Sequence, residues 1–300
     1  MSTSTLVNSF GAGDALDRPA VDRANLCKVC HDDRLEVFEH TARCRNCGVL
    51  LFFPYPTSDM LVRGGDRKAL WLDWYCESGF RNARNFANMI EFALGDVSTA
   101  KDLAILDYGG GGGQFALTAL THFPRAIVSM TDIDNAALLP QYRSANHPIP
   151  FERFEADATR FDIIFMNDVF EHVEHPEATL LMLAGKLKPG GRLFVDTPKT
   201  FWLFPVLRVL CPPIYRKLCR GTVTREHLQI WTRRAFHRVA GAASLRVTRY
   251  AELSEFTMPP EFYLRSMGIE NPLLVAAGRL FYRSAGRLAK NKIMAVLERS

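Results

Sequence analysis

The sequence predicts an α/β protein built on a doubly wound sheet, with a small cysteine-rich module in front of it. Two observations lead to this prediction. The apolar run Leu103–Asp107 passes through Tyr108 into five consecutive glycines, Gly109–Gly113, and a helical pattern begins at Gln114. Strand, glycine turn and helix form the first unit of a doubly wound fold. Nearer the amino terminus, four of the seven cysteines form two CxxC pairs.

Length and composition agree with a globular protein. The chain has 300 residues, of which 48% are hydrophobic and 23% charged, so it has room for one domain of about 200–250 residues and a small module. No run of 18 or more apolar residues occurs, and we expect no transmembrane helix. The first residues contain neither a basic stretch nor an apolar one, so we expect no signal peptide.

Charge is distributed unevenly along the chain. Residues 201–300 contain 17 Lys and Arg against 6 Asp and Glu, whereas the first two hundred residues contain 20 against 26. A basic carboxyl-terminal third predicts an acidic partner, such as a phosphate-bearing substrate, an anionic membrane surface or nucleic acid. A solvated basic face without a partner is the alternative.

The cysteine pairs predict a structural zinc ribbon over residues 25–57, after a flexible tail over residues 1–24. Each CxxC pair presents two thiolates, and short alternating segments lie between and after the pairs. Four thiolates complete a tetrahedral Zn²⁺ site and leave no open position. Four free thiols are the alternative. The expected ligands are Cys27, Cys30, Cys44 and Cys47.

An ordered set of motifs follows the ribbon. Asp107 lies two residues before a GxGxG pattern made by Gly109, Gly111 and Gly113, while no P-loop and no strict GxGxxG pattern are present. A second strand ends at Asp132, and further segments follow at Phe154–Ala158, Phe161–Val173 and Leu187–Pro198. Together these segments resemble the motif set of class I S-adenosylmethionine (SAM)-dependent methyltransferases. The resemblance implies a Rossmann-like seven-stranded sheet over residues 58–300, with the last strand antiparallel.

The resemblance also implies roles for single residues. The glycine loop would pass under the methionine part of SAM, with Asp107 behind it. Asp132 would accept the ribose hydroxyls, Asp157 would accept from the adenine amine, and Ala158 would donate from its backbone. Asn167 would lie near the transferred methyl group. Helix capping or a solvated loop is the alternative for the acidic residues.

The CxxC and CxxCG pattern ahead of such a domain resembles a group of bacterial enzymes that act on sugars and other small metabolites. We therefore expect methyl transfer to a small-molecule acceptor, with a hydroxyl of a sugar or of a lipid- or nucleotide-linked saccharide favoured. Carbon methylation of a keto-sugar is a further option. An RNA methyltransferase that uses the ribbon and the basic third to grip RNA is one alternative. A non-catalytic SAM-binding protein is another.

Two histidines are candidates for the general base that a hydroxyl acceptor requires. His172 follows the fourth strand, and His227 precedes a helix expected to return over the same edge of the sheet. Histidine changes its charge near neutral pH. A capping or packing role is the alternative for each.

Residues 199–224 and 255–289 are predicted to form insertions, or lids, on the acceptor side. Their apolar and basic character is also typical of a membrane interface. We expect a cytoplasmic protein, with peripheral contact to the inner face of a membrane as an option.

Overall fold

The computed structural model describes residues 26–56, 85–95, 102–134, 137–201, 203–254, 270–285 and 290–300. The predicted tail over residues 1–24 lies outside these ranges. So do residues 57–84, where the predicted boundary between ribbon and larger domain falls, and residues 255–269 and 286–289 of the second predicted insertion.

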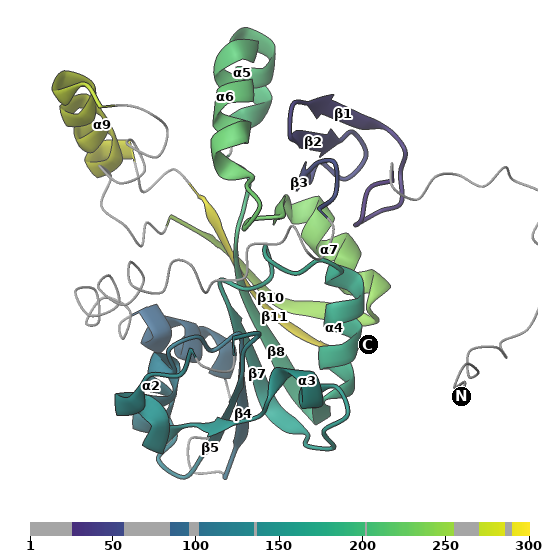
Figure 1. Ribbon diagram of the computed structural model, residues 1–300, viewed down its shortest axis with the longest axis vertical. Coiled ribbons are helices and arrows are strands. Elements are labelled where there is room, and N and C mark those ends of the chain that lie inside the picture. Colours follow the sequence, from purple (N-terminus) through teal and green to yellow (C-terminus); the bar gives the residue numbers. More distant parts are fainter. Residues whose placement is uncertain are drawn as a thin grey trace, which may run out of the picture.

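The larger part of the molecule is a seven-stranded sheet in the order β10-β11-β8-β7-β4-β5-β6 (Figure 1). From β8 to β6 each strand runs parallel to its neighbour. Only β11 runs antiparallel, to both β8 and β10, and it lies between them. The predicted sheet with an antiparallel last strand is confirmed. The bounds are β4 Ala104–Tyr108, β5 Ile127–Thr131, β6 His147–Pro148, β7 Phe161–Asn167, β8 Leu187–Pro198, β10 Leu245–Leu253 and β11 Lys292–Arg299.

Helices cover both faces of this sheet. Successive strand residues point to opposite faces, so neighbours on one strand belong to different apolar clusters. On β4, Leu106 packs into the cluster that includes α4 and α7, whereas Ile105 packs into the one that includes α2 and a helix at residues 85–94. The two layers are visible in Figure 1. The bounds are α2 Gln114–His122, α4 Pro176–Gly185 and α7 Arg233–Ala242.

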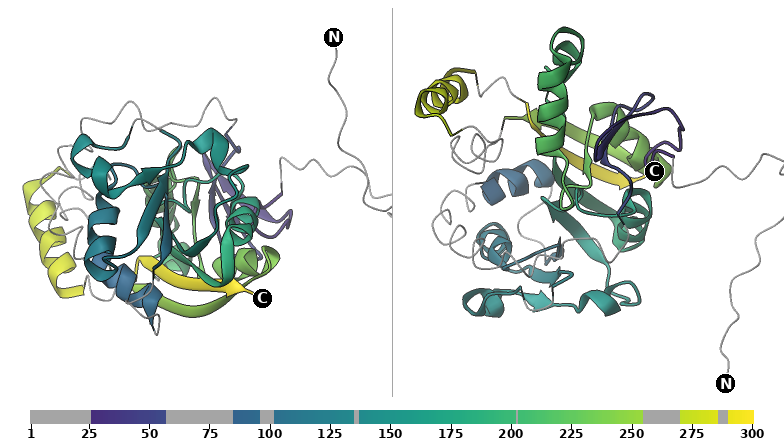
Figure 2. Two further views of the ribbon diagram at one scale, coloured as in Figure 1. Left: turned by 90° about the horizontal axis from the view of Figure 1, so that it is seen from below. Right: turned by 45° about the horizontal axis from the view of Figure 1, so that its top comes forward.

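The connections contain shorter helices. A 3-10 helix, η3 (Pro140–Ala145), and a single turn, α3 (Phe151–Phe154), flank β6. Two helices, α5 (Phe204–Leu210) and α6 (Pro212–Thr222), follow β8 and lie within residues 199–224, for which the sequence predicts an insertion. They stand away from the large sheet in Figure 1 and in the right-hand view of Figure 2, and so does α9 (Pro272–Ala285).

The cysteine-rich module forms a second, four-stranded sheet that includes a strand of the larger part. Its order is β1-β2-β3-β9, with β1 Leu35–Phe38, β2 Thr41–Cys44, β3 Leu50–Phe52 and β9 Gln229–Ile230. Leu51 pairs with Gln229, and Leu50 with Ile230. The hydroxyl of Thr232, which caps α7, also donates to the carbonyl of Cys47 at 2.7 Å. The module is therefore fixed to the large sheet through β9 and the start of α7.

Candidate functional site

The glycine loop connects the end of β4 to α2 through left-handed backbone. Gly109, Gly111 and Gly113 have φ values of 78°, 49° and 84°, a region that favours glycine. A Cβ at Gly109 would lie 2.3 Å from Cγ2 of Val169, just after β7. The amides of Gly109 and Gly110 both donate to the carbonyl of Thr131, at the end of β5. Glycine thus allows the loop to pack against the ends of two neighbouring strands.

Asp132 lies directly beside this loop. The Gly111 amide donates to its Oδ2 at 2.9 Å, and the Asp134 amide donates to its Oδ1 at 2.9 Å. No heavy atom of the described residues lies within 4 Å of a Cβ added to Gly111. The loop is therefore open at Gly111, where a ligand would meet both backbone and a half-buried carboxylate.

Asp107 lies beneath the loop and is almost fully buried. Its Oδ2 lies 2.8 Å from the position that a Cβ on Gly110 would occupy. Burial, followed by the nearby charge of Asp132, raises its pKa to about 7. A buried carboxylate is costly without a partner. A cationic group bound above the loop would stabilise the charged form of Asp107.

Asn167, the last residue of β7, carries an unsatisfied amide. Its Nδ2 and its Oδ1 are both buried, and neither has a hydrogen-bond partner in the described part of the chain. Buried polar atoms without partners are uncommon in folded proteins. The next residue, Asp168, has a φ of 51°. Polar, unpartnered atoms at the carboxyl end of β7 fit a bound ligand with hydrogen-bonding groups, and SAM has such groups.

Asp157 and Ala158 do not join this group. They follow α3 and precede the start of β7, so they lie at the amino end of the parallel strands. Lys186, just before β8, donates to the backbone carbonyl of Asp157, and the Asp157 carboxylate accepts from the Thr159 amide at 2.7 Å. The expected contact with adenine therefore does not fit this structure. The third strand is the two-residue β6, which ends at Pro148, well before Asp157.

His172 and His227 lie side by side although they come from distant segments of the chain. Their ring centroids lie 4.9 Å apart at 66°. Glu171 completes the group, with Oε1 3.8 Å from Nε2 of His172. Burial raises the pKa of Glu171 to about 7 and lowers the pKa of His227 to about 4. The backbone N–H of His172 donates to the carbonyl of Val169 at 2.9 Å. The Val169 side chain packs against Gly109, so the cluster is connected to the glycine loop through Val169.

The four ribbon cysteines form a tight, buried cluster. Their Sγ atoms lie within 4.8 Å of one another, with Cys27 to Cys47 at 3.7 Å and Cys30 to Cys44 at 3.4 Å. The hydrogen bond with Cys47, and then burial, raise the pKa of the Cys27 thiol. Soft thiolate ligands in a closed group of four suit Zn²⁺. The donor set therefore fits a structural zinc ion.

The residues after the two CxxC pairs adopt similar backbone conformations. His31 has a φ of 55° and Gly48 a φ of 81°. The left-handed region costs a non-glycine residue about 1 kcal/mol or more. The His31 amide donates to the carbonyl of Cys27, and the Gly48 amide to that of Cys44, so both turns close in the same way.

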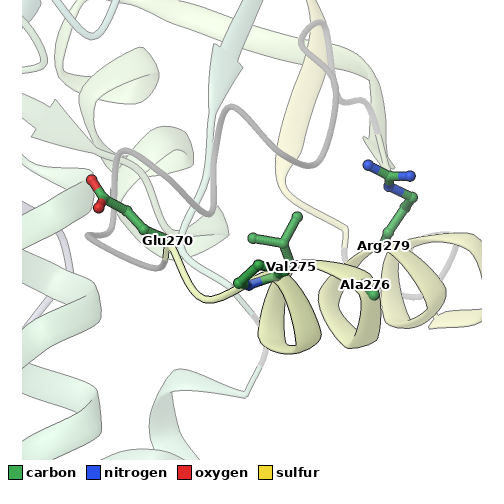
Figure 3. A pocket seen from close by; sticks show the side chains of 5 residues that line it. Glu270, Val275, Ala276 and Arg279 are labelled. Atoms are coloured by element: carbon green, nitrogen blue, oxygen red, sulfur yellow. The ribbon is translucent and has the colours of Figure 1, made fainter.

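A separate pocket of about 290 Å³ lies beside α9, lined by Glu270, Pro272, Val275, Ala276 and Arg279 (Figure 3). No residue of the predicted site lines it. Within the described part of the chain, its lining comes from α9 and the residues just before it.

A family model described as a methyltransferase domain matches residues 79–250 of the chain, which is more than half of its length. The chain belongs to the methyltransferase domain family. The matched region of this methyltransferase domain protein contains the glycine loop, Asp132, Asn167 and the histidine pair.

Relatives of the methyltransferase domain include two O-methyltransferases. A ubiquinone biosynthesis O-methyltransferase of Coxiella burnetii is 29% identical over 134 residues, which cover 42% of this chain and 56% of that relative. A malonyl-[acyl-carrier protein] O-methyltransferase of Halalkalibacterium halodurans is 32% identical over 111 residues, which cover 33% of this chain and 41% of that relative. The chain thus matches only about half of the length of these relatives. A solved cyclopropane synthase from Mycobacterium tuberculosis has a TM-score of 0.49 at 15% identity, covering 69% of this chain and 82% of that one.

Two buried residues near the histidine pair, Glu171 and Gln229, are not among the site residues that the sequence predicts. Glu171 is 1% exposed and sits beside His172, and Gln229 is 1% exposed and holds the segment around Glu171. An acidic residue directly before a histidine at a strand end was a usable signal for Glu171. Gln229 gave no local signal, because its partners lie more than 50 residues away.

Proposed function

We propose that this protein is a SAM-dependent methyltransferase that acts on an oxygen atom of a small-molecule acceptor. The observation that supports it best is the glycine loop, open at Gly111 and bonded to Asp132, in a chain of the methyltransferase domain family. Both relatives named above are O-methyltransferases, which favours oxygen over carbon or nitrogen.

The residues of the chain have separate parts in this proposal. The glycine loop and Asp132 would bind SAM, which supplies an activated methyl group. Asp107 would balance its positive charge from below, and Asn167 would offer its free amide near the reacting groups. Alignment of acceptor and methyl group supplies much of the rate enhancement in such reactions. A hydroxyl acceptor must also lose a proton, and Glu171, His172 and His227 gather where that proton would leave.

The ribbon would bind one structural Zn²⁺ ion and support this site from outside. Its strand β3 pairs with β9, which begins two residues after His227. Zinc would stabilise β3, and β3 would hold β9 in register. The expected domain division, with a ribbon over residues 25–57 and a methyltransferase domain over residues 58–300, belongs to this proposal.

The surface of the insertion favours an apolar or lipid-linked acceptor. Val209 and Leu210 of α5 are 72% and 73% exposed, and Leu273 of α9 is 80% exposed. Basic side chains accompany them on α6. Apolar and basic residues together suit the surface of an anionic membrane. Within the described residues, no helix combines the length and hydropathy needed to cross a bilayer.

Two measurements test the proposal. Calorimetric titration with SAM should show binding that Asp132→Ala weakens at least tenfold, while Asp157→Ala leaves it unchanged. Equal loss in both variants, or no binding by the unaltered protein, would contradict the proposed cofactor site.

The acceptor class is tested with methyl-labelled SAM and a bacterial cell extract. We expect label in a nuclease-resistant saccharide or lipid fraction. Label in nuclease-sensitive material would instead establish the RNA alternative, and binding of SAM without any transfer would establish a non-catalytic role.

A further inference from the structure

The strongest unexplained feature is the grouping of Glu171, His172 and His227 near the glycine loop. One potential ligand atom from each side chain lies within 4.8 Å of the others. Glu171 is buried, His227 is half-buried, and the side chain of His172 is 40% exposed. Three converging nitrogen and oxygen donors with one accessible side form an open group, in contrast to the closed set of four cysteines.

A hydrogen bond fixes the direction in which the His172 ring presents its lone pair. Nδ1 lies 2.7 Å from the carbonyl oxygen of Glu226. A carbonyl oxygen only accepts, so Nδ1 carries the hydrogen, and the neutral ring has its lone pair on Nε2. Histidines that bind metals usually donate their second ring N–H in this way.

The lone pair of His172 then faces another acceptor. Nε2 lies 3.8 Å from Oε1 of Glu171, too far for a direct hydrogen bond. Two ligands that each lie about 2.1 Å from a tetrahedral ion are roughly 3.4 Å apart. The observed separation is close to the value that a shared cation produces.

The backbone holds the ligand-bearing segments together. The amide of Leu228, next to His227, donates to the carbonyl of Glu171 at 2.8 Å, and the His227 amide donates to the Thr224 hydroxyl at 3.0 Å. The hydroxyl of Thr197 donates to Oε2 of Glu171 at 3.0 Å, which leaves Oε1 directed to His172. A ligand set fixed by its neighbours loses little entropy when an ion binds.

Lys292 and Asp168 lie near this group and carry opposite charges. Lys292 contacts Asp168 at 2.8 Å and Asp196 at 2.6 Å. The positive charge of Lys292 opposes a bound cation, whereas the half-exposed carboxylate of Asp168 favours one. Because Lys292 is held between two carboxylates, its net effect on the group is small.

We propose that Glu171, His172 and His227 bind a divalent cation and leave coordination positions open toward the acceptor side. Two histidines and one carboxylate suit Mn²⁺, Fe²⁺, Co²⁺ or Zn²⁺. The site deepens the proposed function and rests on it for its role, which is to bind an acceptor hydroxyl and lower its pKa. The hydroxyl proton would pass to solvent water at the exposed side of His172, the oxygen would take the methyl group of SAM, and S-adenosylhomocysteine would leave. Both histidines would then be ligands rather than proton acceptors.

Binding of Mn²⁺ tests the site without any methyl transfer. The protein is first given one equivalent of Zn²⁺, which the four thiolates bind in preference to the histidine and carboxylate ligands, and any unbound zinc is removed by gel filtration. Mn²⁺ is then titrated while the free ion is followed by electron paramagnetic resonance. Mn²⁺ forms the weakest complexes of the divalent first-row series, so it will not displace zinc from the thiolates. The test variants are His172→Gln and His227→Asn.

His175→Gln is the matched control. His175 also lies beside a glutamate, with Nε2 3.7 Å from Oε1 of Glu174, but its side chain is 70% exposed. Among the described residues it belongs to no group of three potential metal ligands. We expect the unaltered protein and His175→Gln to bind Mn²⁺ equally, and each test variant to bind at least tenfold more weakly. Circular dichroism confirms that each variant is folded.

Two outcomes would overturn the cation site. One is the absence of Mn²⁺ binding at millimolar concentration, and the other is equal weakening by the control. Because SAM is absent, neither outcome affects the proposed methyl transfer. That proposal fails separately if labelled SAM transfers no label, whether or not Mn²⁺ binds.

Discussion

The side-chain amide of Gln229 donates to the carbonyl oxygen of Phe170 at 2.9 Å. The same Nε2 atom donates to the carbonyl of Val173 at 2.8 Å, so Gln229 holds both ends of the segment that carries Glu171 and His172. Through its own backbone Gln229 also pairs with Leu51 of the ribbon. One buried residue thus connects the cysteine-rich module to the candidate site.

Gln229→Met should weaken both folding and turnover. Each lost hydrogen bond is worth about 1 kcal/mol, so we expect the free energy of unfolding to fall by about 2 kcal/mol. Turnover should fall further than this loss of folded protein accounts for, because Glu171 and His172 lose their anchor. Gln141→Met, at an exposed position of η3, is the control. Full turnover in the folded fraction of Gln229→Met would show that the anchor is dispensable.

Cys44→Ser should remove zinc from the ribbon and loosen β9. Elemental analysis should find about one zinc ion per chain in the unaltered protein and much less in the variant, because three thiolates bind more weakly than four. Cys211→Ser is the control, since Cys211 is a half-buried free thiol outside the cluster. Protein purified with no zinc in its unaltered form would refute the ribbon assignment.

Gly111→Ala should impair SAM binding but lower stability no more than the control variant Gly190→Ala does. Gly111 and Gly190 both have positive φ, 49° and 72°, and an added Cβ meets no atom within 4 Å at either position. Each alanine should therefore cost about 1 kcal/mol of stability from backbone strain. Only Gly111→Ala places its methyl group where the ligand would approach, and we expect its SAM affinity to fall at least tenfold. Similar SAM affinity in Gly111→Ala and Gly190→Ala, measured by calorimetry, would show that the cofactor does not bind at this loop.

Asp107 should make stability depend on pH in a known direction. Burial raises the pKa of Asp107 from 3.8 to about 7, so between these values the folded protein retains a proton that the unfolded chain has lost. The contribution of Asp107 to stability therefore falls as the pH rises through this window, by at most about 1.4 kcal/mol per pH unit.

Asp107→Asn removes this titration. The free energy of unfolding of the variant, relative to that of the unaltered protein, should rise between pH 5 and pH 7 in denaturant titrations, on the order of 1 kcal/mol or more. A difference that does not change with pH would mean that Asp107 is charged, and paired, throughout this range.

Local patterns in the sequence were enough to predict several individual elements of the fold. The glycine loop, the strand ending at Asp132 and the two CxxC pairs all depend on residues close together in the chain. Their conformations are set by backbone sterics at glycine and by the short spacing of the cysteines. The antiparallel last strand came from the family resemblance, and the structure confirms it.

Tertiary structure decided the features that join distant segments. The expected role of Asp157 failed because the short β6 ends at Pro148, so Asp157 falls at the opposite end of the strands from Asp132. Glu171 and His227 come from distant segments that meet where β9 pairs with the ribbon strand β3 and where Gln229 donates to the carbonyl of Phe170, in the segment after β7. Pairing of β3 with β9 and the buried hydrogen bonds of Gln229 depend on how separate elements pack, and no pattern within one element specifies that packing.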